Sequence, residues 1–186
     1  MSPDEHGLPR ERIVESHRIF QGRVFDVRLD TVERENGHRY SREVVEHSQV
    51  VAIVPIDTEG RLLLVRQYRA PAEEVMLEIP AGGVDSGETL EQAVQRELQE
   101  ETGQRAGRLE RLCGFYASPG YSSEFIHVFL ATDLTSGHLP GDEEEAIVVE
   151  RLPLKEALTK IETGEIRDGK SIVGLLMAAG RGIHNG

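Results

Sequence analysis

Apolar and charged positions alternate from residue 25, and near residue 48 the pattern changes to continuous apolar runs. Phe25, Val27 and Leu29 alternate with charged residues, which is the period-two pattern of a half-buried strand. Asn36-Gly37 is a strong tight-turn dipeptide, and a second run at 40–46 follows it. Such a meander buries little by itself. We therefore predict a small N-terminal antiparallel sheet over residues 1–47 that packs on the rest of the chain or on a second subunit.

From residue 48 to 186 the pattern predicts a second domain of buried strands and a few helices. Because strands and helices mix without a regular βαβ alternation, the predicted fold class is α+β, a mixed α/β sandwich. A helix is predicted at 89–102, with Gly103 as its C-terminal cap. Strands are predicted near 50–54, 62–65, 112–117, 125–131 and 146–152, and two further helices near 154–163 and 171–179. Residues 77–79 form a further short apolar piece.

One face of the helix at 89–102 turns from apolar to acidic along its length. At 100° per residue, Leu90 and Val94 lie on one stripe, Glu97 and Glu101 continue it, and Glu100 flanks it. A solvated face is the usual interpretation of a Glu-rich helix, but these glutamates share the azimuth of the core stripe. Carboxylates at this spacing repel one another and stand near a helix C-terminus that disfavours them. A hard divalent cation, Mg²⁺ or Mn²⁺, would offset both effects.

The segment before this helix suits a phosphate. Residues 80–88 form a glycine-rich loop that includes Gly82, and glycine allows close backbone approach. Arg96, beside Glu97, could orient carboxylates or contact a phosphate.

The amino-acid composition limits the classes of partner and substrate that we expect the protein to bind. A net charge of −12 disfavours nucleic acid and anionic membranes, so cations must mediate the approach of any phosphate substrate. No apolar run approaches the ~20 residues that span a bilayer, and the N-terminus lacks a secretory pattern, so a cytoplasmic location is expected. The lone Cys113 excludes an intramolecular disulfide and is expected to be buried in a strand, and His127 is expected to be a packed histidine.

The spacing of the loop and helix residues resembles the Nudix box, G-x5-E-x7-R-E-U-x-E-E-x-G-U, where U is a bulky apolar residue. A chance match of eight specified positions in such a chain is on the order of 10⁻⁵. The last position departs from the pattern, because Gln104 replaces the apolar residue. The matched residues are Gly82, Glu88, Arg96, Glu97, Leu98, Glu100, Glu101 and Gly103.

Further segments resemble the ADP-ribose pyrophosphatase subgroup of this family. The segment 118–124 looks like its SPG-containing segment, with Pro119 sixteen residues after Gly103. The acidic run 141–145 looks like the loop that supplies a catalytic carboxylate. The N-terminal meander resembles the sheet through which these enzymes form swapped homodimers. The likeness covers residues 11 to 180.

The resemblance implies a Nudix fold and a role for each matched residue. Glu97 and Glu101 would be the principal ligands of two or three metal ions, assisted by Glu100 and the Ala81 carbonyl. Glu88 and Arg96 would orient the ligand helix, and either Glu143 or Glu145 would position or deprotonate the attacking water. Catalytic roles are thus expected for Arg96, Glu100, Glu143 and Glu145, and substrate contacts for Phe20, Arg42, Arg69, Gly82, Ser118, Pro119, Gly120 and Glu124.

Several of these residues have a plainer interpretation. Arg42 and Arg69 could sit in exposed strand pairs, and Phe20 could be a core residue of a hairpin. The SPG segment could be only a turn, and the acidic run only a solvated loop.

The expected activity is Mg²⁺-dependent hydrolysis of the pyrophosphate bond of ADP-ribose to AMP and ribose 5-phosphate by a homodimer. Because the box is shared, GDP-mannose, NADH and dinucleoside polyphosphates are alternative substrates. A sensor that binds ADP-ribose without cleaving it is a second class of alternative, disfavoured because every box carboxylate is present. An acidic scaffold protein would not account for the register of the matched positions.

Overall fold

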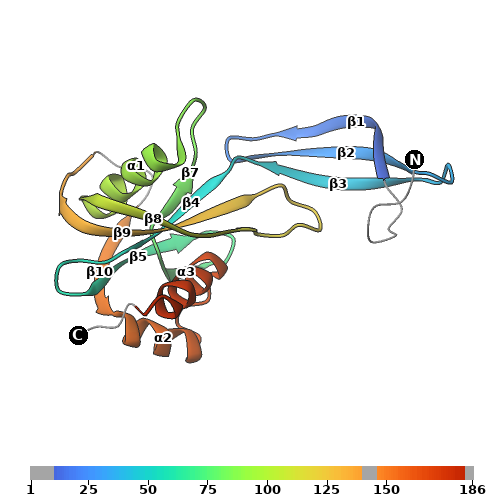
Figure 1. Cartoon of the computed structure of the whole chain (residues 1–186). Coiled ribbons are helices and arrows are strands. Elements are labelled where there is room, and N and C mark those ends of the chain that lie inside the picture. The colour runs from blue at the N-terminus through green and yellow to red at the C-terminus, as the bar shows by residue number, and fades with distance from the viewer. Residues whose placement is uncertain (1–10, 140–145, 183–186) are drawn as a thin grey trace. The chain divides into compact units, whose positions relative to one another are not determined.

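A computed structural model describes residues 11–139 and 146–182, which form two compact units (Figure 1). The first unit consists of the described residues up to Ser48 together with Tyr116–Phe125. The second consists of Gln49–Phe115 and the described residues from Ile126 onward. None of the helices in these ranges is long and apolar enough to cross a membrane.

The first unit contains the predicted small antiparallel sheet. Its strands β1 (Glu11–Gln21), β2 (Phe25–Arg34) and β3 (Arg39–His47) pair in the order β1-β2-β3. The Asn36-Gly37 turn is confirmed, because Gly37 has a positive φ of 79° and its N–H donates to the Arg34 carbonyl at 2.9 Å. The sequence pattern did not indicate β1, whose residues lack a regular alternation.

Burial in β2 differs from the apolar pattern of the sequence. Phe25 is 43% exposed, whereas Asp30 and Val32, on the opposite face, are 2% and 6% exposed. Asp30 is tolerated there because it accepts a hydrogen bond from Ser16 Oγ at 2.7 Å and pairs with Arg28 Nη1 at 3.2 Å. A partnered aspartate thus takes a buried position that hydropathy alone would give to an apolar residue.

The second unit is built on two sheets. One has the order β7-β4-β9-β8 and contains β4 (Val50–Pro55), β7 (Ala81–Gly83), β8 (Gln104–Tyr116) and β9 (Phe125–Ser136). The other has the order β10-β5-β6 and contains β5 (Arg61–Arg69), β6 (Glu74–Glu78) and β10 (Ile147–Pro153). Strand β4 runs parallel to β9 and antiparallel to β7. Every residue of β4 is buried, as expected for a strand covered on both faces.

The helices cover the two faces of β4. Val51 and Ile53 pack with α1 (Leu90–Thr102) in one apolar cluster. Ala52 and Val54 lie in the larger cluster, which includes residues of α2 (Leu154–Glu162), α3 (Gly169–Gly180) and the second sheet. The second unit is therefore an α+β sandwich, as the order of elements predicted. Strand β4, which is buried in its core, also pairs with β7, and the glycines of β7 lie beside α1.

Candidate active site

Helix α1 begins and ends where the sequence predicted. Thr89 is the N-cap, and its Oγ1 accepts the N–H of Gln92 at 3.2 Å while Gln92 Oε1 accepts the N–H of Thr89 at 2.8 Å. At the other end Gly103 is left-handed, with φ 68°, and its N–H donates to the Gln99 carbonyl at 3.0 Å. These caps fix where the helix begins and ends.

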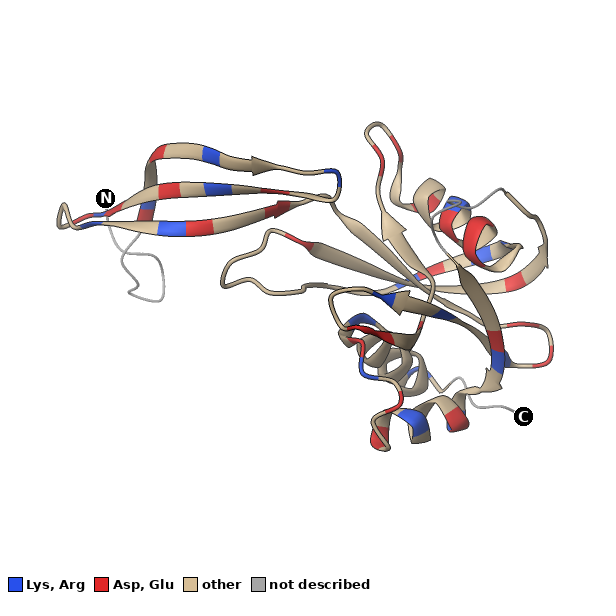
Figure 2. Cartoon of the chain, turned by 180° about the vertical axis from the view of Figure 1, so that it is seen from behind, with Lys and Arg blue, Asp and Glu red and all other residues tan. Residues whose placement is uncertain are grey.

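The inner face of α1 is apolar and then acidic, and both parts face the protein. Ala93, Val94 and Leu98 are fully buried, and Glu97 is only 8% exposed. Glu97 is therefore not part of a solvated charged face. Figure 2 shows the acidic and basic positions that α1 carries.

Gly82 makes room for the Glu97 carboxylate. It lies in β7, paired with Val51 of β4, and a methyl group built on it would stand 2.0 Å from Glu97 Oε1. Any side chain at this position would occupy the space of the carboxylate. Position 82 therefore requires glycine, because strand and helix approach each other closely there.

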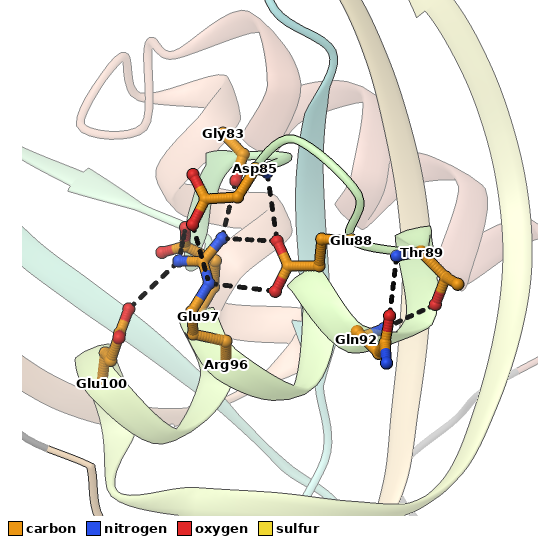
Figure 3. A network of polar contacts seen from close by, with 8 residues as sticks. All are labelled: Gly83, Asp85, Glu88, Thr89, Gln92, Arg96, Glu97 and Glu100. Atoms are coloured by element: carbon orange, nitrogen blue, oxygen red, sulfur yellow. Dashed lines mark hydrogen bonds and ion pairs between the residues drawn. The ribbon is translucent and has the colours of Figure 1, made fainter.

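Arg96 donates hydrogen bonds to polar groups of both the loop and the helix (Figure 3). Its Nε and Nη2 donate to the two oxygens of Glu88 at 3.1 and 3.0 Å, and Nη2 also donates to the Gly83 carbonyl at 2.7 Å. Its Nη1 donates to Glu97 at 2.6 Å and to Glu100 at 3.2 Å. The hydrogen bond from Arg96 lowers the pKa of Glu88, and that same pair raises the pKa of Arg96. Asp85 Oδ2 also lies 3.9 Å from Nε, so one guanidinium joins the loop, through Asp85, Glu88 and the Gly83 carbonyl, to Glu97 and Glu100 of the helix.

Glu101 reaches the same strand. Its Oε2 accepts the N–H of Ala81 at 3.2 Å, one residue before the glycine that cradles Glu97. The resemblance implied the Ala81 carbonyl as a further ligand, and the structure places the backbone of Ala81 beside a box carboxylate. Helix α1 therefore contacts two successive residues of β7, Ala81 and Gly82.

The donor set at this end of α1 suits a hard divalent cation. Within residues 11–139 and 146–182, no three histidine, cysteine, aspartate or glutamate side chains converge as a ligand cluster, and Arg96 Nη1 contacts two of the glutamates. The acidic side chains of this end of the helix nevertheless offer only oxygens as ligands, and the Gly82 cradle holds one of these carboxylates in a buried position. Oxygen-rich carboxylate sites are those that Mg²⁺ and Mn²⁺ prefer.

Arg69 lies in a charged cluster near the start of the loop. Its Nε and Nη2 donate to the two oxygens of Glu78, each at 2.8 Å, and Lys170 Nζ contacts the same carboxylate. Burial by itself would raise the pKa of Glu78, but the hydrogen bonds from Arg69 and the charge of Lys170 lower it to about 2. Sequence analysis did not identify Glu78 or Lys170, and the only signal was an acidic residue inside the apolar stretch at 75–79.

Two other residues expected at the site, Arg42 and Phe20, lie in the sheet of the first unit. Arg42, on β3, lies over the Tyr40 ring, 4.9 Å from its centroid, and 3.8 Å from Glu11. Phe20, at the end of β1, is 51% exposed and lies 6.0 Å from the ring of Phe25. Phe20 is thus not a core residue of its hairpin.

The SPG segment folds as a turn in the first unit. The Ser118 carbonyl accepts the N–H of Tyr121 at 3.2 Å and that of Ser122 at 2.9 Å, so Pro119 and Gly120 lie at its tip. Glu124, at the end of this segment, donates its N–H to Ser122 Oγ at 3.2 Å. The expected catalytic residues Glu143 and Glu145 lie outside the described residues.

His127 is a packed histidine, as predicted. Its Nε2 lies 2.7 Å from Gln49 Oε1 and its Nδ1 lies 2.9 Å from Arg111 Nη2. Burial lowers its pKa, and the charge of Arg111 adds to this effect. Cys113 lies in β8, where it is half-buried and burial raises the pKa of its thiol.

Comparison with known families identifies the class of protein. The sequence model of the NUDIX domain matches residues 46–173, and that of the nucleoside diphosphate sugar hydrolase N-terminal domain matches residues 11–45. The chain belongs to the Nudix family, and the box carboxylates gathered by Arg96 are those of its motif.

The chain is also similar to individual proteins along most of its length. The chain is 39% identical to the ADP-ribose pyrophosphatase of Bacillus subtilis (strain 168) over 163 residues, which cover 87% of this chain and 88% of that protein. It is 38% identical to the methanol dehydrogenase activator of Bacillus methanolicus, over 89% of this chain and 91% of that protein. Among solved structures, that of an ADP compounds hydrolase matches with a TM-score of 0.84 and 29% identity, covering 95% of this chain and 98% of that one.

Proposed function

We propose that this Nudix pyrophosphohydrolase cleaves the pyrophosphate bond of ADP-ribose to AMP and ribose 5-phosphate, with Mg²⁺ or Mn²⁺ as its cofactor. The observation that carries the proposal is the buried Glu97 carboxylate, cradled by Gly82 and joined to Glu88 and Glu100 through Arg96. The ADP-ribose pyrophosphatase of Bacillus subtilis, similar along most of the chain, supports the choice of substrate.

The helix carboxylates are the groups that would hold the cation. We assign Glu97 and Glu101 as principal ligands, with Glu100 and the Ala81 carbonyl assisting, for two or three ions. When bound, such cations neutralise phosphate oxygens and lower the pKa of a bound water. Arg96 holds Glu97 and Glu100 by hydrogen bonds, and its contact with the Gly83 carbonyl fixes the loop to the helix.

The remaining residues bind the substrate and handle the proton. In the proposed reaction a water oxygen attacks one phosphorus in line, a new P–O bond forms, and the bridging P–O bond breaks. Glu143 or Glu145 accepts the proton of the water. Arg42 and Arg69 bind phosphate oxygens, Phe20 stacks on the adenine, and further substrate contacts come from Gly82, Ser118, Pro119, Gly120 and Glu124.

The proposal includes a homodimer formed through the small N-terminal sheet and a cytoplasmic location. Large apolar side chains on this sheet support the dimer, because Ile13, Ile19 and Phe20 are 54%, 63% and 51% exposed in the single chain. Light scattering would give the mass in solution. A monomer at micromolar concentration would contradict this part of the proposal.

Product analysis tests the activity. The purified protein is incubated with ADP-ribose, GDP-mannose, NADH and a dinucleoside polyphosphate, with Mg²⁺, with Mn²⁺ and with EDTA. We expect AMP and ribose 5-phosphate from ADP-ribose, and no product in EDTA. Faster cleavage of another compound would make that compound the substrate in place of ADP-ribose and would leave the family assignment unchanged. ADP-ribose binding without cleavage of any compound would favour the sensor.

A further inference from the structure

On one face of the sheet in the first unit, an aromatic ring lies between two arginines. Tyr40 of β3 pairs with Val32 of β2, so these two side chains share a face of the sheet. Arg34 follows Val32 by two residues and is level with His38, whose carbonyl accepts its N–H at 3.0 Å. Arg42 follows Tyr40 by two residues, so it lies on the same face. The two arginines therefore approach the ring from opposite directions along the strands.

Both guanidinium groups lie over the Tyr40 ring. The Cζ atoms of Arg34 and Arg42 are 5.0 and 4.9 Å from the ring centroid, within the ~6 Å at which the face of an aromatic ring attracts a cation. The His38 ring stacks beside Tyr40 as well, with 5.7 Å between the two centroids. Tyr40 therefore contacts these neighbours through the faces of its ring.

The hydroxyl group of Tyr40 does not explain why a tyrosine stands at this position. It is buried, and no residue in the described part of the chain forms a hydrogen bond with it. It lies near enough to Glu11 to lower the pKa of that carboxyl, but the geometry is not that of a hydrogen bond. Because a buried hydroxyl without a partner costs free energy, the ring is the part of Tyr40 that contributes favourable contacts.

The N–H groups of the two arginines are used differently. Arg34 Nε donates to Glu11 Oε1 at 3.2 Å. Within residues 11–139 and 146–182, no group accepts a hydrogen bond from Arg42, and the carboxylate nearest to it is that of Glu11, 3.8 Å from Nη2. The Arg42 side chain is 52% exposed. Arg42 is therefore held chiefly by its contact with the Tyr40 ring.

Arg42 is the exception among the arginines of this sheet. In an acidic protein, most arginines are expected to pair with carboxylates, and pairing uses their N–H groups. Every other arginine of β1, β2 and β3 has a carboxylate oxygen at 3.4 Å or less, namely Arg12, Arg18, Arg28, Arg34 and Arg39. The contact with an aromatic face thus replaces, for Arg42, the carboxylate that its neighbours have.

We propose that Tyr40 is a positioning residue that holds Arg42 for the phosphate oxygens of the substrate. This inference rests on the proposed function, in which Arg42 binds such oxygens. A ring holds a guanidinium by its flat face, so the N–H groups at its edges stay available to an anion. A carboxylate in the place of the ring would use these N–H groups and neutralise the charge. Because the ring also limits the positions of a half-exposed side chain, less conformational freedom is lost when the substrate binds.

Removing the ring should weaken substrate binding and leave the chemical step unchanged. We expect Tyr40→Leu to raise KM for ADP-ribose about fivefold, with kcat within about twofold, because a cation–π contact at an exposed site has an effect of this size. Tyr40→Phe keeps the ring and removes only the hydroxyl, so it should restore KM to within about twofold of the unmodified chain. Steady-state kinetics give both constants, and thermal unfolding of each variant separates loss of folded protein from loss of affinity.

A double-mutant cycle connects the effect of the ring to Arg42. Arg42→Met alone should raise KM on the order of tenfold, because a charged donor to phosphate is lost. Adding Tyr40→Leu to Arg42→Met should raise KM no further, since the ring then has no Arg42 guanidinium to hold. Arg39→Met is the control for charge: Arg39 lies on the opposite face of β3, pairs with Glu33 and is 62% exposed, so its KM should stay within about twofold.

The outcomes separate this inference from the activity itself. A raised KM in Y40L, a normal KM in Y40F and no further rise in the Y40L/R42M double variant would support it. A normal KM in Y40L or in R42M, an equal rise in Y40F, or additive rises in the double variant would overturn it while leaving the activity intact. If Y40L does not fold, Tyr40→Thr, which suits a strand and also lacks a ring, is measured in its place. Failure of the unmodified chain to bind or cleave ADP-ribose would overturn both proposals.

Discussion

The carboxylate of Glu97 lies so close to the backbone of Gly82 that a single methyl group on the glycine would stand 2.0 Å from Oε1. Glu97 is buried and also bonded to Arg96, so it has no open side to which it could move without breaking that contact. Strand β7 and helix α1 are therefore matched to one another at this pair, and the pair provides the most direct test of the site.

Replacing Gly82 by alanine should displace Glu97 from its place. We expect Gly82→Ala to lower kcat/KM about 100-fold, because a displacement of about 1 Å at a reacting centre has this effect, and to cost about 1–3 kcal/mol of stability from overpacking. Steady-state kinetics and urea unfolding measure the two. Gly180→Ala, at the end of α3 where a Cβ meets nothing within 4 Å, is the control and should be neutral in both. Full activity in the Gly82 variant would show that the cradle is not needed.

Removing Arg96 should expose the repulsion among the carboxylates that it joins. We expect Arg96→Met to lose about 2–3 kcal/mol of stability in EDTA, because charged groups lose their buried partner. Added Mg²⁺ should raise the melting temperature of this variant more than that of the unmodified chain. Arg96→Lys should be intermediate, since an ammonium group cannot match the forked contacts of the guanidinium. Arg108→Met, which removes an arginine with a 71% exposed side chain, is the control for charge alone.

Neutralising Glu101 should affect activity and stability in opposite ways. We expect Glu101→Gln to lower kcat at least about 100-fold, which is about 2.7 kcal/mol of barrier, at saturating Mg²⁺. In EDTA the same variant should be about 0.3–0.5 kcal/mol more stable, because one like-charge repulsion on the helix is relieved. Near-full activity would make the ligand assignment wrong, and a large stability loss would indicate a structural role. Glu91→Gln, on the exposed first turn of α1, is the matched control.

The low pKa of Glu78 predicts how acid destabilises the protein. Its pKa in the folded chain is about 2, against 4.5 for an unperturbed glutamate, so the unfolded state binds the proton more readily. The resulting stabilisation, about 3 kcal/mol by linkage, is fully present above about pH 4.5 and is lost as the pH falls towards about 2. Carboxyl NMR should give a Glu78 midpoint near 2, and urea unfolding between pH 6 and pH 2.5 should show the loss. A midpoint above 4 would mean that Arg69 and Lys170 do not hold this carboxylate in solution.

The parts of the fold that depend on local sequence could be predicted. The cap residues Thr89 and Gly103 and the apolar stripe between them fixed helix α1 within one residue, because capping is decided by neighbours in the chain. The Asn36-Gly37 turn was predictable for the same reason. The spacing of the box identified the family, since its residues lie on one loop and one helix.

Features that depend on distant partners could not be predicted. The glycine-rich segment reads as a loop, but residues 81–83 form strand β7 because β4 offers a paired edge. Asp30 is buried because Ser16, fourteen residues earlier, supplies a hydrogen bond. Glu78 and Lys170 lie 92 residues apart in the sequence, so no local pattern predicts that they pair.

The way the first unit is assembled has a consequence for synthesis of the chain on the ribosome. Its three strands come from the N-terminus, but the turn bonded to β3 comes from residues 116–125: Ser123 Oγ accepts the N–H of His47, 76 residues earlier. At translation rates of about 5–20 residues per second, β3 is made about 4–15 s before this partner exists. A nascent chain would therefore hold an incomplete, partly apolar sheet for several seconds, and this interval is when another nascent copy could pair with it.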